Sequence, residues 1–342
     1  MRRHVLVIVA LVLICSLSPV SSHFYAAEEA SFKFKFSTQF PAPHRCSLLY
    51  EQWCKDVEKR TNGRVKWSYF PAAMLTPPQQ TYDSIVKGIA DAGQSVFAYT
   101  RGKFTLTEVI DLPLGYKTGY VSNKLINEYY KKFKPKEMDD VKVLWLHTTS
   151  PGLLMTAKKP VSKMEDVKGM KIRSQGMTAK VVQALGAAPV GMTVNEAYDA
   201  LMKGVADGAM LPIEALKGFK LGEVLHFVTQ NYGSAYATGE FVVMNKEKWN
   251  ALPDDIKKII DTMSEEYIEK QAKLWDEIDV EGTEFFLQKG GKFVPLTKEE
   301  DARWVRAMGP IFDEYIKETK AKGLPGEEAL KFCQEYLKKN QQ

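Results

Sequence analysis

The chain has 342 residues and a formal net charge of +5, from 47 Lys and Arg against 42 Asp and Glu. This length is enough for two domains with hydrophobic cores of their own. So small a basic excess slightly favours small anions as ligands and by itself argues nothing about nucleic acid, which we do not expect as a partner.

Residues 1–27 have the order of a secretory signal peptide. Arg2 and Arg3 precede the uncharged apolar run Val5–Leu17, and the small residues of Ser21–Ala27 follow. An uncleaved membrane anchor is the alternative, but a run of about 13 residues is shorter than the roughly 20 that cross a bilayer. We therefore predict cleavage near residue 27 and export to the periplasm. Loss of two arginines leaves 45 basic against 42 acidic residues, a formal charge of +3.

The first part of the mature chain alternates strands and helices, which predicts a largely parallel sheet. Residues 31–37 alternate Phe with Lys, the period of a strand with one buried face. A helix over 44–61 should end at Asn62-Gly63, since both residue types tolerate a left-handed cap. Further elements are expected at 64–70 (strand), 76–87 (helix), 90–97 (strand), 120–133 (helix), 141–147 and 153–157 (strands).

The turn Ser150-Pro151-Gly152 predicts a crossing into a second α/β unit, where the alternation restarts over 169–211. A long strand over 235–245 would return the chain. A helix over 254–289 would reach roughly 50 Å, longer than one domain of this size, so we expect it to contact both units. A strand at 293–296 and helices over 298–321 and 327–339 complete the prediction. The expected fold class is thus α/β, with residues 28–151 plus 237–280 in lobe I and 152–236 plus 281–342 in lobe II.

Three cysteines follow residue 27: Cys46, Cys54 and Cys333. If the first two share a helix, their separation of eight residues places them roughly 12 Å apart, too far for a disulfide. Either one of them pairs with Cys333, or all three are small buried residues. No CxxC motif or His–Cys cluster occurs, so we expect neither a metal nor a cofactor.

One arginine ends the first strand of the second unit, with no catalytic partner beside it. Ile172 and Ser174 share one face of this strand, so Arg173 should lie opposite the buried side. A guanidinium at the carboxyl end of a strand can hold a carboxylate through two parallel hydrogen bonds. The alternative is an ordinary solvated charge, like Lys171. The pattern favours a receptor for a small organic anion.

The sequence offers little for catalysis. After residue 27 the only histidines are His44, His147 and His226, and neither GxSxG, HExxH nor a Gly-rich phosphate loop occurs. A serine nucleophile or a pair of carboxylates needs no local motif, so a secreted enzyme acting on an organic acid stays an alternative. We expect a protein that is not an enzyme.

The stretch Met164–Gly208, the segment Val86-Lys87-Gly88-Ile89-Ala90-Asp91 and the segment Trp249-Asn250-Ala251-Leu252-Pro253 carry a family resemblance that covers nearly the whole mature chain. It resembles the substrate-binding proteins of tripartite ATP-independent periplasmic (TRAP) transporters, the DctP-type family. The resemblance implies a periplasmic-binding-protein-like fold, in which two α/β lobes close on a ligand and a long helix spans both. It further implies an arginine, by position Arg173, that anchors the ligand's carboxylate, and delivery of the ligand to the TRAP membrane permease. A ligand-binding sensor for signalling and the receptor of an ATP-driven importer share this architecture and stay open as alternatives.

Departures from the family suggest an apolar pocket. Some members carry a second arginine at the position of Leu153, and polar residues of some relatives fall at Val96 and Leu211. Together with Phe97 and Val194, these side chains would favour apolar ligand surface, because burying an unpaired hydroxyl against them costs about 1–3 kcal/mol. We therefore expect a monocarboxylate with an apolar or aromatic side chain, not a sialic acid or a dicarboxylate. The alternative is that all five are core residues.

Five further residues are candidates: one lies in the loop after the first strand, where the family places ligand contacts, and four lie at or beside strand ends that face the cleft. They are His44, Gln94, Tyr99, Glu214 and Tyr236. His44 could equally cap a helix, and Glu214 could either receive an amino group or complement a helix N-terminus. We expect the mature protein to act as a monomer.

Overall fold

The computed structural model describes residues 31–341, so the predicted signal peptide lies outside the described residues. A first sheet has the strand order β2-β1-β3-β10-β4. β1 (Phe32–Thr38) pairs in parallel with β2 (Val65–Phe70) and β3 (Ala92–Val96), whereas β10 (Gly239–Asn245) runs antiparallel to β3 and to β4 (Val141–Thr148). The alternation predicted for β1 is present, since Phe34 and Phe36 are buried and the lysines between them are exposed.

A second sheet has the order β11-β9-β5-β8-β6-β7. β6 (Lys171–Ser174) lies between β7 (Ala188–Gly191) and β8 (Gly208–Pro212) and is parallel to both, as the alternation over 169–211 predicted. β5 (Gly152–Thr156) runs antiparallel to β8 and β9. Two differences from prediction concern strands: β9 (Phe227–Gln230) was not expected, and β10 begins at Gly239, four residues later than predicted for its strand. β11 (Lys292–Pro295) pairs with β9 at the edge.

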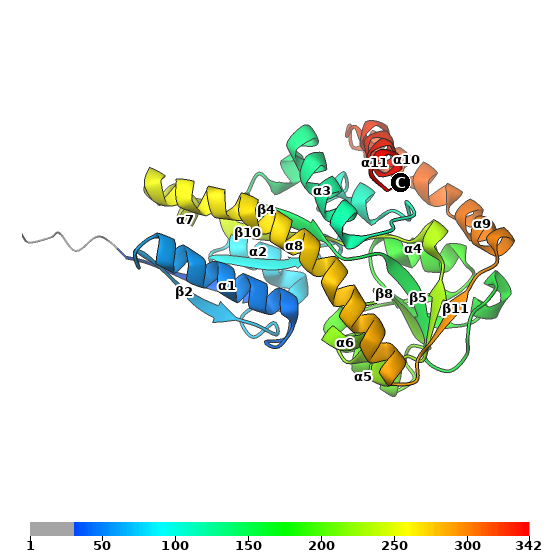
Figure 1. The fold of residues 1–342 in the computed structure, drawn as a ribbon. Coiled ribbons are helices and arrows are strands. Elements are labelled where there is room, and N and C mark those ends of the chain that lie inside the picture. The colour runs from blue at the N-terminus through cyan, green and yellow to red at the C-terminus, as the bar shows by residue number, and fades with distance from the viewer. Residues whose placement is uncertain (1–30, 342) are drawn as a thin grey trace, which may run out of the picture. The chain divides into compact units, whose positions relative to one another are not determined.

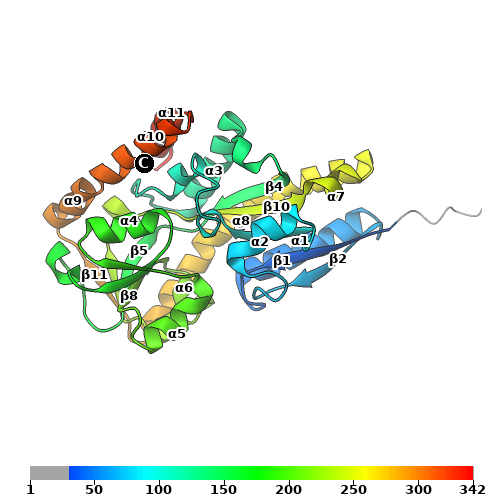
Figure 2. The ribbon, with the colours of Figure 1, turned by 180° about the vertical axis from the view of Figure 1, so that it is seen from behind.

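Helices cover both sheets (Figures 1 and 2). α1 (Arg45–Arg60) ends as predicted at Asn62 and Gly63, which have φ angles of 52° and 78°. The helix predicted over 298–321 is wrong in one respect, because it is two helices that meet at Met308 and Gly309. Pro310 follows and has no N–H to continue the hydrogen-bonding pattern of the preceding helix. The helices of the described residues are α1, α2 (Thr81–Val86), α3 (Gly119–Phe133), α4 (Met177–Ala184), α5 (Ala197–Met202), α6 (Ala215–Gly218), α7 (Lys246–Asn250), α8 (Asp254–Gln288), α9 (Lys298–Ala307), α10 (Gly309–Ala321) and α11 (Gly326–Asn340).

The 35-residue helix α8 contacts the hydrophobic cores of both sheets, as predicted (Figure 1). Its first half packs Ile260 and Met263 against the first sheet, and Phe286 near its end packs into the core of the second. Gly282 allows a close approach, because a Cβ atom there would lie 2.5 Å from the carbonyl oxygen of Ile213. A single helix thereby positions the loop after β8 relative to the first sheet.

The strands divide between the two sheets on either side of the predicted crossings at residues 151 and 237. The lobe boundaries themselves stay a prediction. The end of the chain does not cover the second sheet alone, since Phe332 of α11 contacts Phe133 of α3 with ring centroids 5.7 Å apart.

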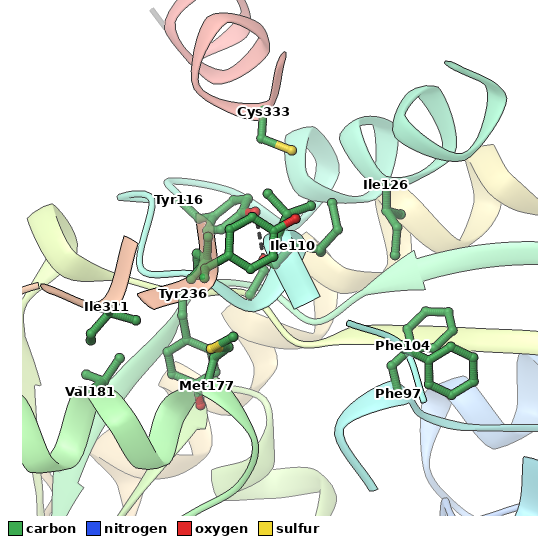
Figure 3. Packing of buried hydrophobic residues seen from close by; sticks show 14 of the residues in the cluster. Phe97, Phe104, Ile110, Tyr116, Ile126, Met177, Val181, Tyr236, Ile311 and Cys333 are labelled. Atoms are coloured by element: carbon green, nitrogen blue, oxygen red, sulfur yellow. Dashed lines mark hydrogen bonds between the residues drawn. The ribbon is translucent and has the colours of Figure 1, made fainter. Parts of the chain in front are cut away.

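Cys46, Cys54 and Cys333 are all free and buried, which confirms the second alternative for them. Cys333 projects from α11 toward the cluster that contains Tyr116 and Ile126 (Figure 3). In the same cluster Tyr116 donates a hydrogen bond to the carbonyl of Ile110, at 2.8 Å. The buried thiols therefore serve as small packing groups.

Candidate functional site

A small cavity of about 30 Å³ lies between residues of the two sheets. It is at the carboxyl ends of the parallel strands β1, β3, β6 and β8, where α/β proteins commonly bind ligands. Its lining consists of Gln39, Phe40, Val96, Tyr99, Thr149, Arg173, Gln175, Val194, Leu211, Pro212, Glu214, Phe219, Tyr236, Thr238 and Glu240.

Arg173 is only 2% exposed. The prediction that it lies opposite a buried side is incomplete, because both faces of β6 are buried at this end. Four hydrogen bonds hold the guanidinium: Nε donates to the carbonyl of Met192 (3.1 Å), Nη1 to that of Met210 (3.3 Å), and Nη2 to Gln175 (2.9 Å) and Tyr99 (3.4 Å). None of these partners is a carboxylate, and no acidic oxygen within residues 31–341 forms an ion pair with Arg173. A permanently charged group is thus buried without a counter-ion.

Tyr99 joins the two sides of the pocket. It follows β3 of the first sheet, and its hydroxyl accepts a hydrogen bond from the backbone N–H of Val194 at 2.9 Å and the longer one from Arg173. Burial raises the pKa of Tyr99, and the nearby Arg173 offsets part of that rise. The hydroxyl therefore stays protonated and accepts hydrogen bonds from two donors on the side of the second sheet, Val194 N–H and Arg173 Nη2.

The apolar wall differs in part from the prediction. Val96, Val194 and Leu211 line the pocket as expected. Phe97 does not, because the chain turns into a short 3₁₀ segment after β3 and Tyr99 faces the pocket instead. Phe97 packs 4.7 Å from Phe104, centroid to centroid, in the core (Figure 3).

Leu153 is also absent from the pocket lining. It is fully buried in the core of the second sheet, directly opposite Leu211 in the pairing of β5 with β8. The ring of Tyr236 lies over Gly152 at the start of β5, and Tyr236 itself lines the pocket as predicted. For Leu153 the core alternative therefore fits the geometry.

Glu240 is a buried pocket residue that the sequence did not single out. Its Oε2 accepts a hydrogen bond of 2.6 Å from Gln94 Nε2, and Thr38 in turn donates to Gln94 Oε1 at 2.7 Å. Gln94 is thus a partner of Glu240 and does not itself line the cavity. Burial raises the pKa of Glu240 well above its usual value, and the Coulombic effect of Glu214 adds to this rise.

His147 lies behind Glu240, with Nε2 at 3.5 Å from Oε2. Trp275 can only donate, and its Nε1 is 3.3 Å from His147 Nδ1, so the proton of the imidazole is on Nε2. Burial lowers the pKa of His147 to about 3, which keeps the ring neutral. The oxygen of Tyr50 lies 2.9 Å from Nε2. Glu240 therefore has no cationic partner.

His44 and Glu214 form a buried pair, with Nε2 2.9 Å from Oε2. His44 Nδ1 accepts a hydrogen bond from the backbone N–H of Cys46, so His44 caps α1, which was one of the two alternatives predicted for it. The proton on Nε2 then points to Glu214. Only Glu214 of the two lines the Arg173 pocket, whereas both line a second, larger groove beside it.

Several lining residues were missed by sequence analysis. Gln39 and Phe40 follow the carboxyl end of β1, where the rule used for Arg173 would also have found them. Thr149 and Thr238 lie beside the crossings between the sheets, and Glu240 lies at the start of an antiparallel strand, positions without a sequence signal.

Within residues 31–341, no group of three or more His, Cys, Asp or Glu is arranged to hold a metal ion. In the same part of the chain, no helix combines the length and the apolar character needed to cross a bilayer.

Comparison with known sequences places these features in a family. The family described as bacterial extracellular solute-binding protein, family 7 (DctP) matches residues 36–319. Among its relatives is the outer membrane transporter protein TsaT of Comamonas testosteroni, which is 26% identical over 290 residues, 83% of this chain and 85% of the relative. The family resemblance stated from the sequence is confirmed.

Solved structures share the fold. A marine metagenome TRAP solute-binding protein specific for aromatic acid ligands, in complex with metahydroxyphenylacetate, is 30% identical with a TM-score of 0.87, over 91% of this chain and 100% of that one. A TRAP solute-binding protein from Rhodoferax ferrireducens with copurified benzoate is 27% identical with a TM-score of 0.84, over 90% and 98%. Structures that are 17 to 19% identical hold glucuronate or galacturonate and show the fold alone. The two-lobed, periplasmic-binding-protein-like α/β fold class is confirmed.

Proposed function

Because the chain belongs to family 7 of the bacterial extracellular solute-binding proteins, we propose that it is a TRAP transport receptor for a small organic monocarboxylate held by Arg173. It acts in the periplasm, after cleavage of a signal peptide, and passes its ligand as a monomer to the TRAP membrane permease. The family consists of transport proteins and not of enzymes, in line with the absence of catalytic motifs from the sequence.

The observation that carries the proposal is the buried guanidinium without a counter-ion. Removing such a charge from water is costly unless an opposite charge and further hydrogen bonds compensate it. A carboxylate can accept two parallel hydrogen bonds from the guanidinium. The two longest bonds of Arg173, to Met210 and Tyr99, are the ones that it can give up at least cost.

The rest of the pocket supports a ligand with an apolar or aromatic body. Val96, Val194 and Leu211 form one part of the wall, and the rings of Phe40 and Phe219 form another. Relatives that are 27 to 30% identical bind benzoate and metahydroxyphenylacetate. When the lobes close around such an acid, exclusion of water strengthens the ion pair with Arg173.

The proposal is tested by a thermal-shift and calorimetric screen of the mature protein with benzoate, phenylacetate, 3-hydroxyphenylacetate, mandelate, succinate and glucuronate. We expect at least one aromatic monocarboxylate to bind more tightly than succinate and glucuronate. Tighter binding of either of those two would contradict the ligand class.

Arg173→Ala should weaken binding of the tightest acid of this panel by about 30-fold to several thousand-fold, since truncating one partner of a buried charge pair costs about 2–5 kcal/mol. Arg173→Lys keeps the charge without the parallel hydrogen bonds, so its affinity should lie between those of the wild type and Arg173→Ala. The matched control is Lys171→Ala, an exposed cation on the same strand. If Arg173→Ala folds and keeps its affinity within about threefold, Arg173 is not the anchor.

A further inference from the structure

The Arg173 pocket contains hydrogen-bonding groups that a carboxylate anchor does not explain. They belong to Gln39, Glu214 and Glu240, which are 3%, 4% and 2% exposed. Both carboxyl groups lie beyond 4.0 Å of the Arg173 guanidinium, because no ion pair joins them to it in the described part of the chain. They therefore are not its counter-ions and need another explanation.

Gln39 gives the plainest sign of a missing partner. Its side-chain amide makes no hydrogen bond with any residue in the range 31–341, and its Oε1 is fully buried. A buried amide left unpaired costs about 1–3 kcal/mol. Because a 180° flip of the amide exchanges its oxygen and nitrogen, Gln39 can either donate a hydrogen bond to a group in the cavity or accept one from it.

The two carboxyl groups each keep one oxygen free of hydrogen bonds. Glu240 uses Oε2 for Gln94, and Glu214 uses Oε2 for His44. The Oε1 atoms have no hydrogen-bond partner among the described residues. Three buried polar side chains with unused hydrogen-bonding capacity thus line the pocket that also contains Arg173.

We propose that Gln39, Glu214 and Glu240 form a subsite for a hydroxyl group, so that the protein selects a hydroxylated carboxylic acid over the same acid without the hydroxyl. This inference rests on the proposed function, since Arg173 is taken to hold the carboxylate. Gln39 directly follows β1 and Glu240 lies in β10, both strands of the first sheet, whereas Arg173 lies in β6 of the second. A hydroxy acid would therefore bond to both sides of the pocket and favour the closed form more than its parent acid does.

A hydroxyl fits these three side chains better than an ammonium group does. An ammonium would bring a second positive charge into a pocket that already holds Arg173. Of the two carboxyl groups, Glu214 already accepts a hydrogen bond from His44, and burial raises the pKa of Glu240 and so disfavours the charged form that would attract an ammonium group. A neutral hydroxyl needs only the spare donor and acceptor sites that are present.

The test compares matched acids by calorimetric titration of the mature protein. The pairs are phenylacetate with 3-hydroxyphenylacetate, phenylacetate with mandelate, and benzoate with 3-hydroxybenzoate; phenylglycine replaces the hydroxyl of mandelate with an ammonium group. We expect at least one hydroxylated acid to bind about 10- to 100-fold more tightly than its parent. Equal affinity within every pair, or tighter binding of phenylglycine than of mandelate, would overturn the inference.

Gln39→Met is the decisive variant, because Gln39 has no side-chain hydrogen bond to lose within the described chain and the change keeps the side-chain length. It should reduce the preference for the hydroxylated acid over its parent acid at least fivefold. Gln334→Met on α11 is the matched control and should not change this preference. An unchanged preference in Gln39→Met would count against the subsite.

The outcomes also separate this inference from the proposed function. If parent acids bind and depend on Arg173 but the hydroxyl has no effect, only the hydroxyl subsite is wrong. If no acid of the set binds, the proposed ligand class fails as well.

Discussion

Replacing Tyr99 with Phe removes one hydroxyl from the pocket and nothing else. That hydroxyl accepts the backbone N–H of Val194 at 2.9 Å and a longer bond from Arg173. In the closed form, the Val194 amide would be buried without an acceptor, which costs about 1–3 kcal/mol. When the lobes are apart, water can hydrate the same amide, so the cost falls mainly on the closed, ligand-binding form.

This cost sets the size of the expected effect. Since 1.4 kcal/mol corresponds to a tenfold change in an equilibrium constant, Tyr99→Phe should weaken ligand binding by about 5-fold to about 150-fold. The thermal midpoint of the protein without ligand should change little. The assay is calorimetric titration with the tightest acid among benzoate, phenylacetate, 3-hydroxyphenylacetate and mandelate.

The matched control is Tyr198→Phe, which removes an exposed hydroxyl that lies 3.1 Å from Glu223, away from the pocket. Its affinity should stay within twofold of the wild type. If Tyr99→Phe also stays within twofold, the hydrogen bond to Val194 does not stabilise the closed form, and the reasoning is refuted.

Two further predictions concern buried groups outside the pocket. Burial raises the pKa of Asp111 to about 8, against about 3.9 for an unfolded chain, so this group makes the protein lose stability as pH rises from about 4 to about 8. In thermal melts, the loss of stability from pH 5 to pH 8 should be smaller for Asp111→Asn than for the wild type. The control Asp254→Asn removes an exposed carboxylate and should lose as much stability as the wild type. Equal losses in all three proteins would contradict the raised pKa of Asp111. Burial also raises the pKa of Cys46, Cys54 and Cys333, so Ellman's reagent should titrate three thiols of the mature chain only after denaturation. Rapid reaction of any of them in the native protein would show that it is accessible.

Much of the fold was predictable because it depends on local periodicity. The alternating Phe and Lys of β1 and the long run without proline that forms α8 each leave a clear pattern. The break at Met308 was missed because the apolar spacing continues across it, although Pro310 is a local signal for a new helix.

The pocket was less predictable because it depends on how distant segments meet. Arg173 could be found, since the carboxyl end of a parallel strand is a recognisable position. Glu240 could not, because its place beside β3 and β4 follows from the sheet order alone. Phe97 and Tyr99 were both predicted to line the pocket, but only Tyr99 does, since a 3₁₀ turn after β3 determines which side chain faces the cavity.

A crystal structure of the mature protein with the tightest-binding aromatic acid would test the central claim most directly. We predict that both carboxylate oxygens accept hydrogen bonds from Arg173, with the aromatic body against Val194 and Leu211. A bound acid whose carboxylate lies elsewhere, while Arg173 keeps only its protein partners, would contradict the account.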